Sequence, residues 1–160
     1  MTAYANEAKP VEKVLEKEIS EEIEETQNIE DAKEDEIDLI KKDCDLLLAE
    51  SFVVNFQSGE STANLSSVQQ EKLNKIANCI SELGITLTVI GHTDNTGSTA
   101  TNLRVGQQRA DAVKAVLIEK GVAENQITTT TKGETEPVAS NNTEEGKEKN
   151  RRIEFKSNNN

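Results

Sequence analysis

The segment with the clearest capacity for chemistry is the loop at residues 91–97, which reads Gly-His-Thr-Asp-Asn-Thr-Gly. It follows a strand-like pattern and precedes a helical one, where side chains and helix N–H groups converge on external ligands. Asp94 offers a carboxylate in this loop, and Arg109 lies about two turns into the following helix. The two residues have two interpretations. They form a surface salt bridge worth about 0–1 kcal/mol, or they clamp a zwitterion, Asp94 binding the ammonium and Arg109 the carboxylate.

Catalytic and metal chemistry find little support in the composition. His92 is the only histidine, and no second His or Cys stands near it to complete a metal site. We therefore expect a structural, hydrogen-bonding role for His92. The sequence offers no nucleophile–base pair and no carboxylate pair of convincing spacing, so we predict no catalytic residue and no cofactor.

Length and charge exclude other classes of function. The chain has 160 residues and a mass of 17.6 kDa, enough for one domain and an extension. Its net charge of −12 argues against binding to nucleic acid, which requires a basic surface. No apolar run approaches the roughly 20 residues of a membrane-spanning helix, so we expect any membrane attachment to use segments absent from this chain.

The acidity is concentrated in an N-terminal extension, predicted at residues 1–43. Residues 1–45 hold 16 Asp and Glu against 6 Lys. Val11, Leu15, Ile19 and Ile23 recur every four residues and predict a helix with a narrow apolar stripe. Three alternatives remain open for this segment: a solvated helical stalk, a stripe that pairs with a protein partner's helix, or disorder.

The remainder of the chain predicts a β-α-β-α-β-β order. This order favours an α/β fold of the two-layer α+β type, a mixed sheet with helices on one face. Ser66 or Ser67 caps the first helix and Gly84 ends it. The expected strands cover residues 51–56, 85–90, 127–131 (at or near an edge) and 152–155; the expected helices cover 67–83, about 102–120 and 144–150.

Three motifs at compatible separations resemble the OmpA-like C-terminal, peptidoglycan-binding domain. The first is the Gly-His-Thr-Asp loop at residues 91–97, and the second is the run Asn102, Val105, Gly106, Arg109-Ala110. The third is Asn-Arg-Arg-Ile-Glu at residues 150–154. The resemblance covers about residues 44–157, which we take as the domain, and leaves 158–160 as a disordered tail.

The resemblance implies non-covalent binding of the peptidoglycan stem peptide, usually through diaminopimelate, whose free end is a zwitterion. Carried over, Asp94 would bind the ammonium and Arg109 the carboxylate. Asn102 would add a hydrogen bond to the ligand or fix the loop, and Thr96 would contribute its hydroxyl or backbone.

The remaining wall of the implied pocket comes from two other segments. Arg152 of the Asn-Arg-Arg motif would line it, with Arg151 as the less favoured alternative. The loop at residues 57–61 would form the opposite rim, without a particular side chain.

The sequence departs from the family pattern at two positions. Val105 replaces the usual Leu, a change in packing, and Gly106 replaces the usual Ser. A glycine here lowers helix propensity by up to about 1 kcal/mol. We therefore expect it to loosen Arg109.

Cys44 and Cys79 leave two alternatives, a disulfide or two buried thiols. Because some relatives of the family carry a similarly placed pair, we predict a Cys44–Cys79 bridge. Such a bridge would close a loop of about 35 residues, contribute roughly 3–4 kcal/mol in the chain-entropy estimate, and require an oxidising compartment.

Together these features predict a binding module of the periplasm or cell envelope, in a parent protein associated with a membrane. It would anchor that protein to the cell wall. The alternative is a structural assembly module in which the pocket is vestigial and the acidic helix recruits a protein partner.

Overall fold

The computed structural model describes residues 9–50, 52–53 and 65–158. The chain divides between Leu39 and Ile40 into two compact units. Helix α1, Lys9–Ala49, belongs to both units, since it crosses that division. It also continues through the domain boundary predicted at residue 44.

The described part of the first unit is the acidic part of α1, which is helical, as in two of the three alternatives proposed. Its apolar stripe is open to solvent: Leu15 is 57% exposed, Ile19 49% and Ile23 53%. Among residues 9–39, which the structure describes in this unit, nothing covers these side chains, because a single helix cannot bury its own stripe.

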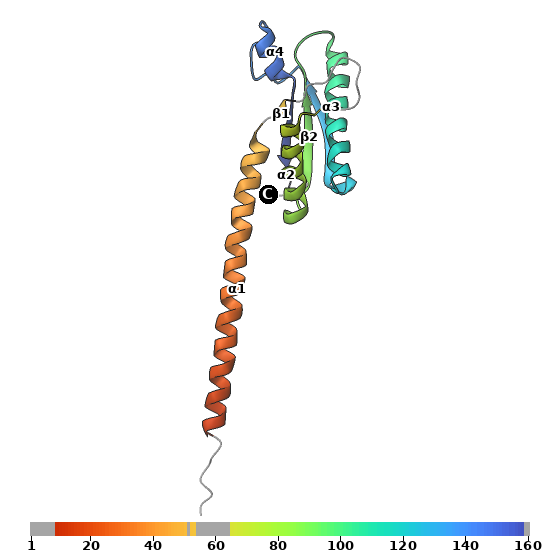
Figure 1. Ribbon diagram of the computed structural model, residues 1–160. Helices are drawn as coiled ribbons and strands as arrows, with labels where there is room; N and C mark the ends of the chain where they lie inside the picture. Colours follow the sequence, from red (N-terminus) through yellow and green to blue (C-terminus); the bar gives the residue numbers. More distant parts are fainter. Residues whose placement is uncertain (1–8, 51, 54–64, 159–160) are drawn as a thin grey trace, which may run out of the picture. The chain divides into compact units, whose positions relative to one another are not determined.

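The second unit carries a four-stranded sheet in the order β1-β4-β2-β3 (Figure 1). Strand β2 pairs parallel with β3 and antiparallel with β4, and β4 pairs antiparallel with β1. The predicted α+β class with a mixed sheet is confirmed, as is the edge position of β3. Its elements are β1 Phe52–Val53, α2 Ser67–Leu83, β2 Leu87–His92, α3 Thr99–Glu119, a 3-10 turn Glu124–Gln126, β3 Ile127–Gly133, α4 Glu144–Asn150 and β4 Arg152–Ser157.

The helix ends follow local capping chemistry. Ser66 caps α2 through a complete capping box with Gln69, and Gly84 ends the helix at a φ of 61°, both as predicted. Helix α3 begins three residues before the predicted start, because the Ser98 side chain accepts a hydrogen bond from the N–H of Thr101.

Two strand ends also differ from the prediction. Strand β2 covers Leu87–His92 instead of residues 85–90, so His92 belongs to the strand and the loop that follows is shorter. Strand β4 extends to Ser157, and Asn158, assigned to the expected tail, donates its N–H to the carbonyl of Thr86 at 2.9 Å. Residues 159–160 lie outside the described residues.

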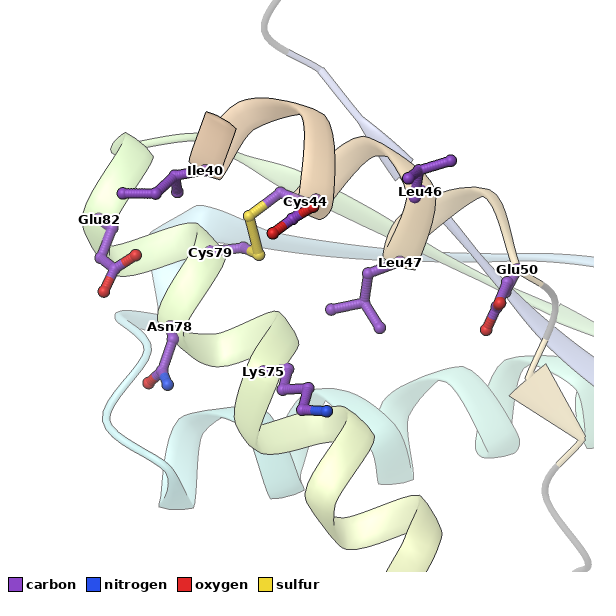
Figure 2. Close-up of a pocket in the computed structure, with 10 residues that line it drawn as sticks. Ile40, Cys44, Leu46, Leu47, Glu50, Lys75, Asn78, Cys79 and Glu82 are labelled. Carbon is purple, nitrogen blue, oxygen red and sulfur yellow. A yellow bond between two sulfur atoms is a disulfide. The ribbon is translucent and has the colours of Figure 1, made fainter. Parts of the chain in front are cut away.

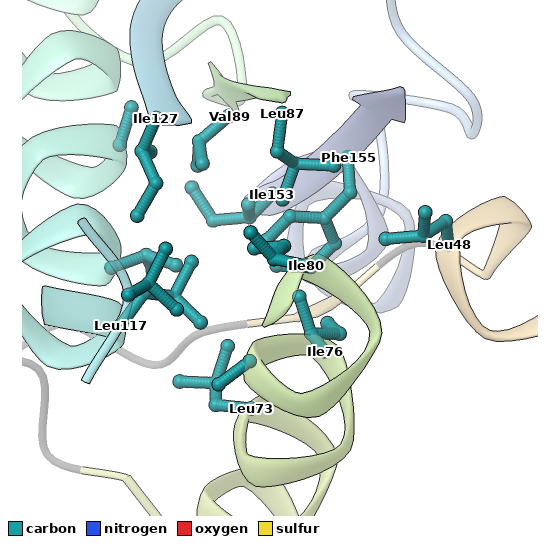
Figure 3. Close-up of a cluster of buried hydrophobic side chains, with 14 residues drawn as sticks. Leu48, Leu73, Ile76, Ile80, Leu87, Val89, Leu117, Ile127, Ile153 and Phe155 are labelled. Carbon is teal, nitrogen blue, oxygen red and sulfur yellow. The ribbon is translucent and has the colours of Figure 1, made fainter. Parts of the chain in front are cut away.

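The hydrophobic core lies between the sheet and helices α2 and α3 (Figure 3). Leu73, Ile76 and Ile80 of α2 are fully buried. Along β2, fully buried residues alternate with partly exposed ones, so one face of the sheet is covered and the other is partly open to solvent. The sheet and α3 contribute Leu87, Val89, Val113, Leu117, Ile127, Ile153 and Phe155 to this core.

A disulfide fastens the last turns of α1 to α2. Cys44 and Cys79 are bonded, with their Cα atoms 5.8 Å apart, as predicted. Figure 2 shows the bridge beside a groove of about 550 Å³ lined by the end of α1 and by α2. None of the predicted ligand-binding residues lines this groove.

Helix α3 approaches strand β2 closely at a pair of glycines. A Cβ atom on Gly91 would overlap the backbone carbonyl of Gly106. A Cβ atom on Gly106 would overlap Oγ1 of Thr131 and come within 2.9 Å of the carbonyl oxygen of Gly91. Gly106 is therefore a packing requirement. Gly106 and Arg109 are both buried where the helix meets the sheet, and the expectation that the glycine loosens Arg109 stays a prediction.

The Gly106→Ala variant tests this packing. Alanine has the higher helix propensity, by about 1 kcal/mol, so propensity alone would stabilise the variant. We expect the opposite, a loss of about 1–3 kcal/mol in the free energy of unfolding from overpacking. Urea denaturation measures it, with Gln108→Ala, at an exposed position of the same helix, as the control. A more stable Gly106→Ala protein would contradict the close approach.

Candidate functional site

The carboxylate of Asp94 lies in the loop between β2 and α3 and is held from two sides. Its Oδ1 accepts the N–H of Thr96 at 2.8 Å, and its Oδ2 accepts a hydrogen bond from Nη1 of Arg151 at 2.8 Å. Asp94 is only 8% exposed. Burial alone would raise the pKa of Asp94, but the hydrogen bonds from Arg151 and Thr96 outweigh it and lower the pKa. The group is therefore a stable anion at neutral pH.

Arg109 lies within electrostatic reach of this carboxylate. Its Nη1 donates to the backbone carbonyl of His92 at 3.1 Å, and the residue is 8% exposed. Burial and the positive charge of Arg151 lower the pKa of Arg109, while the charge of Asp94 acts in the opposite direction. Asp94, Arg109 and Arg151 are thus close enough to influence one another's charge.

The structure brings Arg151 to Asp94, whereas the motif favoured Arg152. Arg151 also reaches Oε1 of Glu144 at 3.0 Å. Arg152 is the first residue of β4, and its buried side chain binds Oε1 of Glu154 at 2.6 Å and the carbonyl of Glu136 at 3.0 Å. Arg151 is the C-cap residue of α4 and lies just outside β4, so the two arginines belong to different elements and bind different partners.

Asn150, directly before these arginines, ties neighbouring segments together. Its Oδ1 accepts the N–H groups of Val138 and Ala139, at 2.8 and 3.0 Å. Its Nδ2 donates to Oδ1 of Asn141, which in turn accepts the N–H of Asn95 at 3.4 Å. Asn150 is fully buried. Sequence reasoning had no role for it, although its place in the Asn-Arg-Arg motif could have suggested one.

The other two predicted residues lie at the same end of α3. Thr96 donates its backbone N–H to Asp94, and its own contact with a ligand stays a prediction. Asn102, 4% exposed, donates through Nδ2 to Oε2 of Glu134, a residue that sequence reasoning did not consider. The loop at residues 57–61, the expected opposite rim, lies outside the described residues.

His92 is buried without the hydrogen bonds expected for its side chain. Neither ring nitrogen makes a hydrogen bond within the described residues, and Nε2 lies 3.5 Å from Oε2 of Glu154. Burial, assisted by the charge of Arg152, lowers the pKa of His92, and Glu154 counteracts this in part. The contribution of His92 to the loop is its backbone carbonyl, which accepts from Arg109. The described residues contain no group of three acidic, His or Cys side chains that could hold a metal ion.

Comparison with known proteins places the chain in a known family. The model of the OmpA family matches residues 55–151, more than half of the chain. This chain belongs to the OmpA family. The solved peptidoglycan-associated lipoprotein from Burkholderia pseudomallei is 28% identical, with a TM-score of 0.61 over 69% of this chain and 92% of that one.

Two curated relatives show the same family by sequence. The chain is 43% identical to "Probable lipoprotein YiaD" of Escherichia coli (strain K12) over 64% of this chain and 46% of that protein. It is 40% identical to "Peptidoglycan-binding protein ArfA" of Mycobacterium tuberculosis, over 61% of this chain and 30% of that protein. The chain thus spans less than half the length of these relatives. Across the described residues, no helix combines the length and apolar character that crossing a bilayer requires.

The lowered pKa of His92 predicts a pH dependence of stability. The unfolded chain binds a proton on this ring near its ordinary pKa of about 6.5, while the folded protein binds it only at lower pH. The free energy of unfolding should therefore fall as pH drops from about 7.5 through 6.5, down to the folded pKa. Denaturation of the wild type and of His92→Gln between pH 7.5 and 5.5 measures this, and the variant should lose most of the slope. An NMR titration of the single histidine with a pKa at or above 6.5 would contradict it.

Proposed function

We propose that this chain binds peptidoglycan non-covalently, through the zwitterionic end of a diaminopimelate residue in the stem peptide. The observation that carries the proposal is the buried carboxylate of Asp94 within electrostatic reach of the buried guanidinium of Arg109. Asp94 would bind the ligand ammonium and Arg109 the ligand carboxylate, because each contact is then charge-assisted.

The charge balance of the site supports a ligand that carries both signs. Two guanidinium groups, Arg109 and Arg151, adjoin a single buried carboxylate, Asp94. With Glu144, which also pairs with Arg151, the site presents both signs of charge, as recognition of a zwitterion requires. The ammonium would use the lone pairs that remain on Asp94, since each carboxylate oxygen accepts more than one hydrogen bond.

Three further residues complete the proposed site. The N–H of Thr96 and the guanidinium of Arg151 hold the carboxylate of Asp94 in place, and Asn102 presents an amide near the start of α3, the helix that follows the Asp94 loop. Arg151 takes the place that the motif gave to Arg152, whose side chain is engaged by Glu154 and the carbonyl of Glu136.

The role we propose is an anchor to the cell wall in the periplasm or cell envelope, without catalysis. The names of the relatives support it, since one is a peptidoglycan-binding protein and another a peptidoglycan-associated lipoprotein. The alternative of a vestigial pocket relied on Gly106 and on the loop at residues 57–61. The close packing of α3 against β2 explains Gly106 without any loss of function.

A protein partner for the acidic part of α1 is a second proposal, compatible with the first. Its support is the stripe of exposed apolar side chains at Val11, Leu15, Ile19 and Ile23 on a strongly acidic helix. A surface of this kind suits a helix that is apolar on one side and basic at its edges.

Binding of a diaminopimelate-containing muropeptide, followed by calorimetric titration, tests the proposed site. We expect Asp94→Asn to weaken binding by about 1.5–3 kcal/mol, or about 10- to 100-fold, because a charge-assisted hydrogen bond is lost. Glu145→Gln is the matched control, because it removes one negative charge at a fully exposed side chain.

Three outcomes of this experiment separate the alternatives. The proposed site predicts that the wild type and Glu145→Gln bind alike and sediment with purified cell wall, whereas Asp94→Asn binds more weakly. Equal affinity of Asp94→Asn and the wild type would refute the role of Asp94. A wild type that neither binds the muropeptide nor sediments with cell wall would favour the vestigial pocket.

A further inference from the structure

Glu134 uses both of its carboxylate oxygens on the first turn of α3. Its Oε1 accepts the hydroxyl of Thr99 at 3.0 Å, and its Oε2 accepts a hydrogen bond from Nδ2 of Asn102. Asn102 is almost fully buried and Glu134 is half-buried, so water competes little for the second bond. A charge-assisted hydrogen bond in such a place is strong enough to fix a side chain.

This contact determines which way the Asn102 amide points. A carboxylate only accepts hydrogen bonds, so the atom of Asn102 that faces Glu134 must be the nitrogen, Nδ2. The carbonyl oxygen Oδ1 is therefore directed elsewhere, as an acceptor. Without Glu134, nothing in this contact would distinguish the two ends of the amide.

The backbone holds Glu134 next to the Asp94 loop. Glu134 follows Gly133, the last residue of β3, and the carbonyl of Gly133 accepts the N–H of Thr93 at 2.9 Å. Gly133 also packs directly against the first turn of α3, where an added Cβ would meet Leu103 at 3.2 Å. The carboxylate thus sits between the strand that borders the loop and the helix that carries the proposed site.

Asn102 and Arg109 lie on the same face of α3. They are seven residues apart, which is close to two full turns, and both are buried. Arg109 is the donor of this face, and Asn102, with its nitrogen occupied by Glu134, supplies an acceptor nearer the loop. The same face of α3 then carries a donor suited to a ligand carboxylate, Arg109, and two turns earlier an acceptor suited to a ligand ammonium, Asn102.

We propose that Glu134 is a positioning residue that orients the Asn102 side chain, so that Oδ1 accepts a hydrogen bond from the ammonium group of the ligand. The inference depends on the proposed zwitterion site. It adds that recognition of the ammonium requires two acceptors, Asp94 and Asn102, and that Glu134 sets the orientation of the Asn102 amide. In this role Glu134 acts on Asn102, since both of its oxygens accept hydrogen bonds from side chains of α3.

Two ligands isolate the ammonium contact: a muropeptide with free diaminopimelate, and the same muropeptide with that amine acetylated. The ratio of their dissociation constants measures ammonium recognition. We expect Glu134→Gln to reduce the ratio about tenfold, because an amide can hold Asn102 in either orientation and the charged hydrogen bond is weakened. Glu136→Gln is the matched control, because it removes the same charge two residues away, at a side chain that is 52% exposed and pairs with Lys132 instead of with α3.

A double-mutant cycle shows whether Glu134 acts through Asn102. Asn102→Ala should reduce the ratio as much as Glu134→Gln, and the double variant should reduce it no further. In the free protein, the side-chain amide NMR signal of Asn102 should shift in Glu134→Gln and stay in place in Glu136→Gln. This second readout needs no ligand.

The outcomes distinguish the inference from the function on which it depends. A wild type that does not bind the free muropeptide refutes the proposed function and this role with it. If the wild type binds selectively, an unchanged ratio in Glu134→Gln overturns the role of Glu134 alone. Additive losses in the cycle would overturn it as well, because Glu134 would then act independently of Asn102. An equal loss in Glu136→Gln would also overturn it, because the effect would then come from net charge.

Discussion

The site depends on keeping one carboxylate ionised while it is almost wholly buried. An unpaired buried charge is strongly unfavourable, so Asp94 requires donors on both of its oxygens. Thr96 supplies one from the same loop, and Arg151 supplies the other from the far end of the chain. The ion pair joins the loop after β2 to the start of β4. The tight turn around Asp94, the position of β4 and the charge of the site all follow from that requirement.

The close contact between α3 and the sheet places Arg109 beside this ion pair. Because Gly91 and Gly106 lack side chains, the backbones of β2 and α3 approach each other directly. Arg109, one turn beyond Gly106, can then donate to the carbonyl of His92 at the end of β2. A larger residue at either glycine would move the helix outward and carry the guanidinium away from Asp94.

Much of this fold could be predicted from periodicity and capping residues. The alternation around Val89 and the capping box at Ser66 indicate elements that the structure contains, because both signals are local. The choice between Arg151 and Arg152 could not be made in the same way. It depends on how the chain turns from α4 into β4, since Arg151 caps the helix and Arg152 begins the strand, and no local sequence signal gives that turn.

Glu134 and Asn150 illustrate the same limit. Each binds partners far away in the sequence, α3 for Glu134 and the segment around Ala139 for Asn150. Such contacts leave no periodic pattern. The resemblance to a family did supply Asp94 and Arg109, because the spacing between those residues is part of a motif that the chain contains.

A crystal structure of the protein with a bound diaminopimelate muropeptide tests the central claim most directly. The account predicts that the ligand ammonium lies within about 3 Å of the Asp94 carboxylate and that the ligand carboxylate lies on the guanidinium of Arg109. A muropeptide bound on another surface, with the Asp94–Arg151 pair untouched and Arg109 not in contact with it, would contradict the account.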